Sequence, residues 1–272
     1  MPSDLTSDIS GSKYELESLA AAEADVRGDV GTAAATDEYL RVKLLPKGQW
    51  GGDPLLQEGL ARERAANMPD ISVSPMQGQL LSILALGIKA ENILEIGTLG
   101  GYSTSFLAKT LPSHGQIDTI ELSPEHAKVA QANFLAMDLY PFPKVHVGKA
   151  LELLQDPAGA FTDSRIPGVE QGLDPKDRGY DLVFIDADKE NILAYFLEAL
   201  RITRKGGIIL VDNAVRGGRI AYEENDKPEI DVVGLRKMYD WIQKDDGKTV
   251  LSTAIQTVGE KTWDGFAIAY KL

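Results

Sequence analysis

The chain has 272 residues, of which 43% are hydrophobic, and it carries a formal net charge of -13 and no cysteine. The charge argues against nucleic acid and anionic membrane surfaces as partners, because binding phosphate groups needs a basic face, and the missing cysteines exclude disulfides and thiolate metal sites. No apolar run approaches the ~20 residues that cross a bilayer, and the N-terminus lacks the features of a signal peptide, so we expect a cytoplasmic protein without membrane contact.

The N-terminal part of the chain differs in composition from the rest. Residues 1–35 are mostly small or acidic, with few aromatic side chains, so they can bury little surface against a core. We expect them to form a poorly ordered or loosely helical extension. We expect residues 36–272 to form a single domain.

Three helices are predicted before the first strand. Thr36 is the expected cap of the first, Asp53 caps the second, and Ser74 opens a capping box for the third. The third helix carries apolar side chains that we expect to face a core, namely Leu80, Leu81, Ile83, Leu84 and Leu86. A later helix, capped by Ser123, is expected to bury Ala127, Ala130, Phe134 and Leu135.

Short apolar segments alternate with helical patterns from Asn92 onward. This alternation predicts an α/β fold with a doubly wound parallel sheet and right-handed crossovers. The last two strands are closely spaced and predict a hairpin, so the final strand should run antiparallel. The stretch Asp156–Arg178 is rich in Gly, Pro and Asp and predicts a long surface loop. The predicted strands are Ile93–Ile96, Ile117–Ile120, Val145–Val147, Leu182–Ile185, Ile208–Val211, Leu251–Thr257 and Gly265–Tyr270.

The first strand runs into a glycine-rich loop and then into a helix. Residues 93–103 read I-L-E-I-G-T-L-G-G-Y-S, an arrangement that lets a ligand approach the backbone closely. The dinucleotide fingerprint needs a glycine where this chain has Leu99, and the Walker pattern is absent. Glu121 ends the next strand, where an acidic side chain can accept hydrogen bonds from ribose hydroxyls. A ribose partner without a pyrophosphate cradle indicates S-adenosylmethionine, although a simple tight turn would also use these glycines.

Polar side chains follow two later strands, at the point where each strand ends. Asp186 and Lys189 come after the fourth strand, and Asp212 and Asn213 come after the fifth. If these strands are neighbours, the side chains converge at the sheet edge where ligands bind in open α/β sheets. Two carboxylates and one amide are the ligand set of a hard cation, Mg²⁺ first, with Mn²⁺ or Ca²⁺ as alternatives. Taken singly, Asp186 would also fit a helix cap, and the Asp212–Asn213 pair would fit an Asx turn.

Three motifs together resemble those of the cation-dependent O-methyltransferases, the family of the catechol and caffeoyl-coenzyme A O-methyltransferases. They are L-E-I-G-T-L-G-G-Y-S-T in the cofactor loop, F-I-D-A-D-K-E-N in the metal and base segment, and G-G-I-I-L-V-D-N in the second metal segment. The resemblance extends from about Thr36 to Leu272. It implies a Rossmann-like, seven-stranded and mostly parallel sheet with an antiparallel last strand, a small phenolic acceptor of the vicinal-diphenol (catechol) type, and a homodimer.

The resemblance also implies roles for individual residues. Lys189 is the implied general base, and Asp186 takes part in catalysis because it lies between cofactor and metal. The implied cation ligands are Asp186, Asp212 and Asn213. The implied contacts to S-adenosylmethionine are Val73, Glu95, Gly97, Thr98, Ser103, Glu121, Ala150 and Asp186. One departure is Gly217, where the plant enzymes carry an asparagine that contacts the substrate, and this difference argues against a coenzyme A ester as the acceptor.

Two other functions compete with this one. A nicotinamide-dependent oxidoreductase would use a similar sheet, but Leu99 and the lack of a Tyr-x-x-x-Lys pair near the expected site speak against it. A non-catalytic protein that only binds S-adenosylmethionine would not need Lys189 beside three intact cation ligands. The acceptor is expected to be selected by the segment Val215–Ile230 and by the chain before Ser74.

Overall fold

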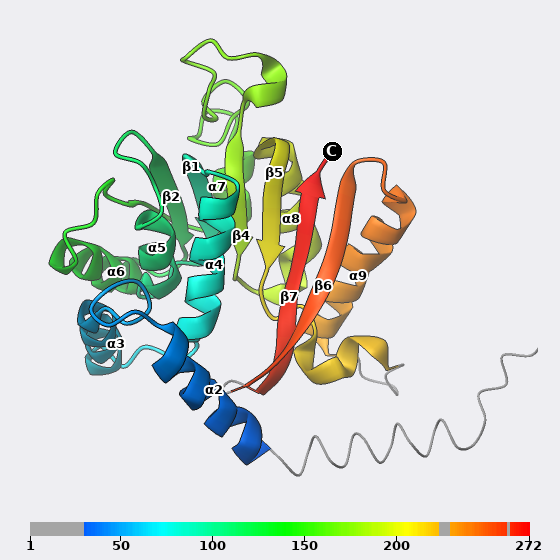
Figure 1. The fold of residues 1–272 in the computed structure, drawn as a ribbon. Helices are drawn as coiled ribbons and strands as arrows, with labels where there is room; N and C mark the ends of the chain where they lie inside the picture. Colours follow the sequence, from blue (N-terminus) through cyan, green and yellow to red (C-terminus); the bar gives the residue numbers. More distant parts are fainter. Residues whose placement is uncertain (1–29, 223–228, 260–261) are drawn as a thin grey trace, which may run out of the picture.

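The fold is an α/β structure built on one seven-stranded sheet, shown in Figure 1. The computed structural model describes residues 30–222, 229–259 and 262–272. The strands are β1 Asn92–Ile96, β2 Gln116–Glu121, β3 Lys144–Val147, β4 Tyr180–Ile185, β5 Thr203–Val211, β6 Val250–Gly259 and β7 Thr262–Lys271. Their order is β3-β2-β1-β4-β5-β7-β6, with β7 antiparallel to both of its neighbours and the other pairs parallel. The predicted sheet with an antiparallel last strand is confirmed.

Helices cover both faces of the sheet (Figure 1). Helices α3 to α6 pack on one face around Phe106 and Phe134, and α7 to α9 pack on the other around Phe196 and Leu235. The described helices are α2 Val30–Leu44, α3 Pro54–Ala65, α4 Pro75–Gly87, α5 Tyr102–Ala108, α6 Pro124–Ala136, α7 Ala150–Gln155, α8 Ile192–Ile202 and α9 Ile230–Asp245, with the 3-10 helices η1 Pro175–Asp177, η2 Lys189–Asn191 and η3 Arg216–Ala221. Within the described ranges, no helix is long and apolar enough to cross a membrane.

Two of the early helices begin where their caps predict. Asp53 accepts a hydrogen bond from Leu55 N at 2.9 Å, and Ser74 exchanges both bonds of a capping box with Gln77. The first helix differs from the prediction, because α2 begins at Val30 and Thr36 therefore lies inside it. Most of the expected N-terminal extension, residues 1–35, lies outside the described residues.

Three apolar side chains that were expected in the core are exposed instead. Ile83 is 58%, Leu86 48% and Leu135 75% exposed. Successive helix residues are about 100° apart around the helix axis. On α4 the face that carries Leu81 and Ala85 is buried, so Ile83 and Leu86 point toward the outside. The predicted apolar faces were therefore too wide, and Ile83 and Leu86 add apolar surface to the outside of α4.

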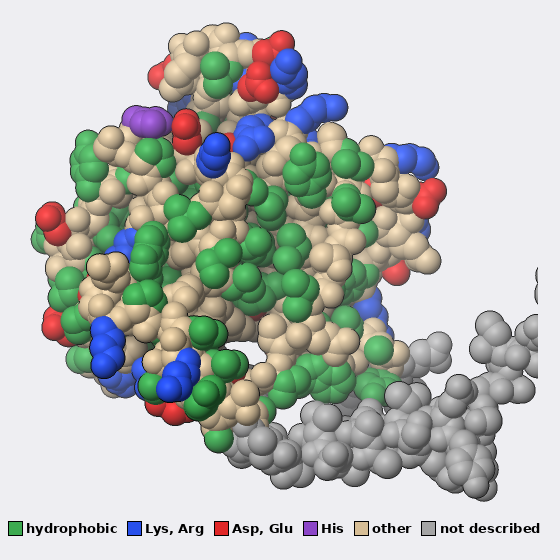
Figure 2. All heavy atoms as spheres, viewed as in Figure 1, with side chains coloured by type: hydrophobic (Ala, Val, Ile, Leu, Met, Phe, Trp, Pro, Cys, Tyr) green, Lys and Arg blue, Asp and Glu red, His purple; other side chains and the backbone are tan. Residues whose placement is uncertain are grey.

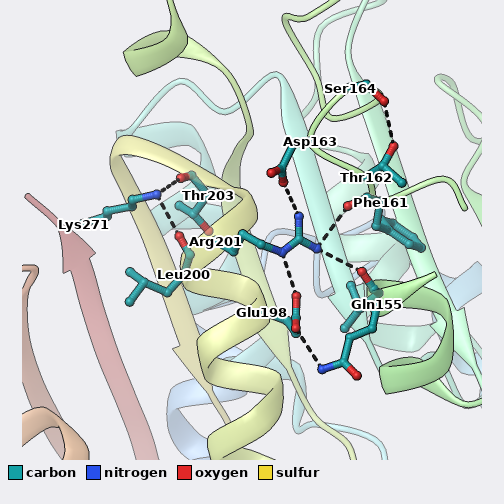
Figure 3. Close-up of polar contacts among 11 residues, drawn as sticks. Gln155, Phe161, Thr162, Asp163, Ser164, Glu198, Leu200, Arg201, Thr203 and Lys271 are labelled. Carbon is teal, nitrogen blue, oxygen red and sulfur yellow. Dashed lines mark hydrogen bonds and ion pairs between the residues drawn. The ribbon is translucent and has the colours of Figure 1, made fainter. Parts of the chain in front are cut away.

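The long loop before β4 is fastened to α8 by Arg201 (Figure 3). The Arg201 guanidinium donates to Asp163 at 2.6 Å, to Glu198 at 2.8 Å, and to the carbonyls of Leu154 and Phe161 at 2.9 and 3.1 Å. The loop leads into the start of β4, and Figure 1 shows it at the end of the sheet opposite to α2. This loop of residues 156–178, here called the insertion, is therefore remote from the carboxyl ends of the parallel strands.

Candidate active site

The predicted site residues lie where neighbouring parallel strands end. Ile185 at the end of β4 pairs with Val211 at the end of β5. Asp186 and Asp212, the next residue of each strand, therefore leave the sheet side by side. Asp186 N donates to Ile96 O at 2.8 Å, and Asp212 N donates to Ile185 O at 3.0 Å. The sheet itself thus fixes the spacing of the two acidic residues.

Lys189 completes a strand-end cluster with these two carboxylates, Asp186 and Asp212. Its Nζ lies 3.2 Å from Asp186 Oδ1, and its side chain is only 5% exposed. Burial raises the pKa of Asp212 well above its usual value, and the charge of Asp186 adds to this shift while Lys189 opposes it. Asn213 adopts a left-handed φ of 51° and donates its backbone N–H to Asp212 Oδ1 at 2.6 Å. Two neighbouring carboxylates at one site favour an added positive charge.

The predicted cation ligands differ from the ligand set of a zinc site. In the part of the chain that the structure describes, no group of three or more His, Cys, Asp or Glu residues could hold a metal ion. The predicted ligands Asp186, Asp212 and Asn213 supply oxygen atoms only, from two carboxylates and one amide. Such a set suits a hard cation that keeps some of its water or substrate ligands.

The glycine loop passes directly against the same cluster. Gly97 has a φ of 103°, and a Cβ there would lie 2.0 Å from the carbonyl oxygen of Asp186. Gly101 has a φ of 81°, precedes α5, and would bring a Cβ within 2.3 Å of the Phe134 ring. Only glycine fits either position. The close approach at Gly97 places the expected cofactor loop beside the expected cation ligands.

Glu121 lies at the end of β2 and holds the glycine loop. Its carboxylate accepts hydrogen bonds from the backbone N–H groups of Leu99 and Ser123, both at 2.8 Å. His126 Nδ1 lies 3.4 Å from the same carboxylate. The side chain predicted to bind ribose is therefore at the expected sheet edge, with its orientation fixed by two backbone donors.

Glu95 is fully buried and forms the centre of a hydroxyl network. Its carboxylate accepts hydrogen bonds from Ser103 at 2.6 Å, from Thr119 at 2.7 Å and from Thr104. Burial raises the pKa of Glu95 to about 7, and the hydroxyl donors counteract this shift. Thr98 joins through a bond of 2.6 Å to Thr119. Three predicted cofactor contacts, Glu95, Thr98 and Ser103, therefore belong to one hydrogen-bond network. Thr104 and Thr119 belong to it as well, although the sequence did not predict them.

Val73 and Ala150 lie just before or at the start of a helix. Val73 is 5% exposed and directly precedes the cap of α4. Ala150 begins α7, shortly after β3 ends at Val147. Because Val147 pairs with Glu121, the start of α7 follows the strand end next to that of β2. Ala150 therefore lies beside the strand ends, and Val73 follows Ser72, which donates to Glu63 next to Gly100 of the glycine loop.

Residues that the sequence analysis did not single out hold the segment after β5. Asp264 of β7 accepts hydrogen bonds from the N–H groups of Val215 at 3.0 Å and Arg216 at 2.9 Å. Tyr239 of α9 donates its hydroxyl to Ala214 O at 2.8 Å. Both elements are remote in sequence from this segment, so residue spacing carries no signal for these contacts.

The segment that carries Lys189 is held from two sides. A Cβ on Gly234 of α9 would lie 1.9 Å from Lys189 O, so glycine is required for this packing. Asp188 accepts hydrogen bonds from the Tyr195 hydroxyl and from Asn191, both at 2.6 Å. Asp188 therefore stabilises η2 and the turn before it.

Several known proteins are similar to this chain in sequence and in fold. A family model described as O-methyltransferase matches residues 53–259. The chain is 42% identical over 219 residues to a catechol O-methyltransferase of Mycobacterium tuberculosis, covering 80% of this chain and 89% of that one. An O-methyltransferase structure from Bacillus cereus in complex with SAH is 39% identical with a TM-score of 0.76, over 89% of this chain and 100% of that one. The O-methyltransferase TomG of Streptomyces achromogenes, solved with SAM, is 33% identical with a TM-score of 0.76, over 89% and 98% of the two chains. The chain therefore belongs to the O-methyltransferase family.

Proposed function

We propose that the protein transfers the methyl group of S-adenosylmethionine to one hydroxyl of a small vicinal diphenol, with the help of a divalent cation. The observation that carries this proposal is the strand-end cluster of Asp186, Lys189 and Asp212 against the glycine loop. The 42% identity to a protein named catechol O-methyltransferase supports the acceptor class. Membership in the O-methyltransferase family makes the oxidoreductase alternative wrong and identifies the protein as an enzyme, which also removes the non-catalytic alternative.

The cluster fits a hard cation, with Mg²⁺ as the first choice. Asp186, Asp212 and Asn213 would hold the ion through two carboxylates and one amide oxygen. The buried Asp212 carboxylate beside Asp186 supports this fit, since a cation would relieve the repulsion between the two charges. When bound, the cation stabilises the deprotonated form of the acceptor hydroxyl.

Lys189 is the proposed proton acceptor. In its neutral form, the buried amine takes the proton of the acceptor hydroxyl and later passes it to water. The phenolate oxygen attacks the methyl carbon of the sulfonium, the carbon–sulfur bond breaks, and its electron pair stays on sulfur to give S-adenosylhomocysteine. This displacement needs oxygen, carbon and sulfur in line, so the fixed glycine loop and Glu121 contribute by orienting the cofactor.

The acceptor would be bounded by η3, in the segment expected to select it. Arg219 pairs with Glu229, and Arg216 pairs with Asp231, so η3 is tied to the start of α9. A Cβ on Gly218 would lie 2.5 Å from the Trp263 ring, which packs directly on this turn. A rigid wall of this kind suits a flat aromatic acceptor. Residues 223–228 of the same segment lie outside the described residues.

We also propose that the protein is a homodimer that pairs through the sheet face on which α4 packs. Leu251, Ile255 and Tyr270 of β6 and β7 are 67%, 48% and 44% exposed. Leu251 pairs with Tyr270 in the strand register, and Ile255 lies four residues further along β6, so all three share one face. Ile83 and Leu86 of α4 are exposed as well, and Figure 2 shows hydrophobic side chains spread across this side of the molecule.

The cation assignment is tested by measuring turnover and binding together. Methylation of catechol by the parent should stop in excess chelator and return when Mg²⁺ is restored. Asp212→Ala should show no Mg²⁺-dependent turnover, while calorimetry should show that it still binds S-adenosylhomocysteine. Asp174→Ala, which changes an exposed aspartate of the insertion, is the matched control and should behave like the parent. Full activity of the parent in excess chelator would defeat the cation assignment.

A further inference from the structure

We propose that Arg62 and Glu63 of α3, with Asn133 of α6, are positioning residues for the cofactor, and we call these three residues the α3 clamp. The clamp holds two segments that flank the proposed cofactor site, the glycine loop at Gly100 and the chain at Ser72. The inference rests on the proposed cofactor site. It extends that site to a helix that precedes the alternating strands and helices of the sheet.

Glu63 connects the two segments directly. It is 4% exposed, and the Ser72 hydroxyl donates to its Oε2 at 3.1 Å. Ser72 immediately precedes Val73, which is one of the proposed cofactor contacts. On the other side, a Cβ on Gly100 would lie 2.2 Å from the carboxyl carbon of Glu63. The Glu63 side chain therefore packs against the loop backbone at Gly100, where the absence of a side chain leaves room for it.

Arg62 reaches the same glycine by a second route. Its Nη1 donates to Asn133 Oδ1 at 2.8 Å, and Asn133 Nδ2 donates to Gly100 O at 2.8 Å. Asn133 is 2% exposed, so its loss would leave the Gly100 carbonyl buried without this donor. Two consecutive residues of α3 thus converge on one residue of the glycine loop.

The loop needs this support because its backbone is unusual on both sides of Gly100. Leu99 and Gly101 have left-handed φ values of 50° and 81°. A residue with a side chain keeps such a conformation only when its surroundings enforce it. Leu99 also donates its N–H to Glu121, the proposed ribose partner. Because the clamp fixes this conformation before the ligand arrives, it lowers the ordering cost of binding, and its loss should weaken cofactor affinity.

The test is calorimetric titration of the full chain with S-adenosylhomocysteine, together with thermal unfolding. Asn133→Leu removes both hydrogen bonds at similar volume and should raise Kd by about tenfold or more. Arg62→Ala leaves the bond between Asn133 and Gly100 in place, so it should raise Kd by a smaller factor. Ile202→Ala, a fully buried change just before β5 at the opposite end of the sheet, should lower the unfolding midpoint without changing Kd.

Several outcomes would overturn the clamp. The clamp is overturned if the Kd of Asn133→Leu lies within about twofold of the parent Kd. A twofold change in Kd is well below the effect expected from one lost buried hydrogen bond. A matching rise in Kd for Ile202→Ala would also overturn the clamp, because general destabilisation would then explain both variants. If Asn133→Leu does not fold, Ser72→Ala tests the clamp instead, because it removes the hydrogen bond to Glu63. A higher Kd for this variant would support the clamp, and an unchanged Kd would overturn it. A parent that binds no S-adenosylhomocysteine would instead overturn the proposed cofactor site.

Discussion

The proposed role of Lys189 depends on how its side chain is fixed. Its Nζ lies 3.2 Å from Asp186, and its backbone packs against Gly234 of α9. A free lysine side chain has large rotamer freedom, which a positioned proton acceptor must give up before the reaction. Here the packing of η2 and the Asp186 contact restrict that freedom in the folded protein.

Lys189→Ala should lower kcat with a catechol by about 10²-fold or more, the usual size for a lost general base. The reason is that no positioned amine then takes the proton of the acceptor hydroxyl. Initial rates at saturating cofactor measure the effect. Lys128→Ala, which changes an exposed ammonium paired with Glu125 on α6, should keep the parent rate. A Lys189→Ala variant as fast as the parent at neutral pH would remove Lys189 from this role.

Asp186 and Asp212 could be predicted as site residues because each is the first charged residue after an apolar strand segment. Asp186 and Asp212 directly follow strands whose apolar residues are buried on both faces, so the strand ends are evident in the sequence. Asp264 and Tyr239 could not be predicted in this way. Their contacts with the segment after β5 depend on where β7 and α9 lie in space, and no local pattern specifies that position.

Among the elements, strands β2, β3 and β4 are joined by the buried carboxylate of Asp118. His146 Nε2 lies 2.7 Å from its Oδ1, and the Tyr180 hydroxyl donates to its Oδ2 at 2.9 Å. Burial alone would raise the pKa of Asp118, but hydrogen bonds from His146 and Gln116 outweigh it, so the pKa lies below its ordinary value of 3.8. The folded state therefore favours the ionised form of this group more than the unfolded state does.

Asp118→Asn should lower the free energy of unfolding at pH 7 by about 2 to 4 kcal/mol, because it breaks a buried charged network. A lowered folded-state pKa contributes stability above the unfolded value, and this contribution is lost as pH falls through the folded value. The difference in free energy of unfolding between the parent and Asp118→Asn should therefore shrink when the pH falls below 3.8. Urea unfolding at neutral and acid pH measures this difference.

A matched control for this prediction lies in the insertion. Asp163 also accepts a charged hydrogen bond, from Arg201, but its side chain is 80% exposed. Asp163→Asn should change stability little at any pH, because exposed ion pairs contribute little. If the Asp118→Asn difference stayed constant across the acid range, the pH dependence assigned to Asp118 would be wrong.

The antiparallel pairing of β6 and β7 could be predicted from the sequence, but their order in the sheet could not. Close spacing predicted antiparallel pairing, and that prediction is confirmed. The predicted strands alone did not say which of the two would join β5. In the structure β7 joins it, with Phe266, Ala267 and Ala269 buried, whereas Leu251 and Ile255 of β6 are exposed. An inner strand needs a more continuous apolar run than an edge strand, and F-A-I-A satisfies that need better than L-S-T-A-I.

For the whole molecule, the free apolar surface on β6, β7 and α4 favours a second copy of the chain as its partner. A formal net charge of -13 makes two copies repel each other, so self-association needs a face without acidic side chains. Leu251, Ile255 and Tyr270 with Ile83 and Leu86 provide uncharged side chains on one side of the sheet. A two-fold pair brings the same patch of both subunits together, and an uncharged patch avoids like-charge contacts across the two-fold axis.

Ile255→Glu should convert the proposed dimer into a monomer, because the change places two like charges near each other at the interface and desolvates both. Light scattering coupled to size-exclusion chromatography measures the mass, which should fall from twice the chain mass of 29.5 kDa to that mass. Leu197→Glu, which changes a 38% exposed residue of α8 on the opposite face of the sheet, should leave the mass unchanged. A parent that is monomeric at micromolar concentration, or an Ile255→Glu variant that stays dimeric, would show that this face does not pair two subunits.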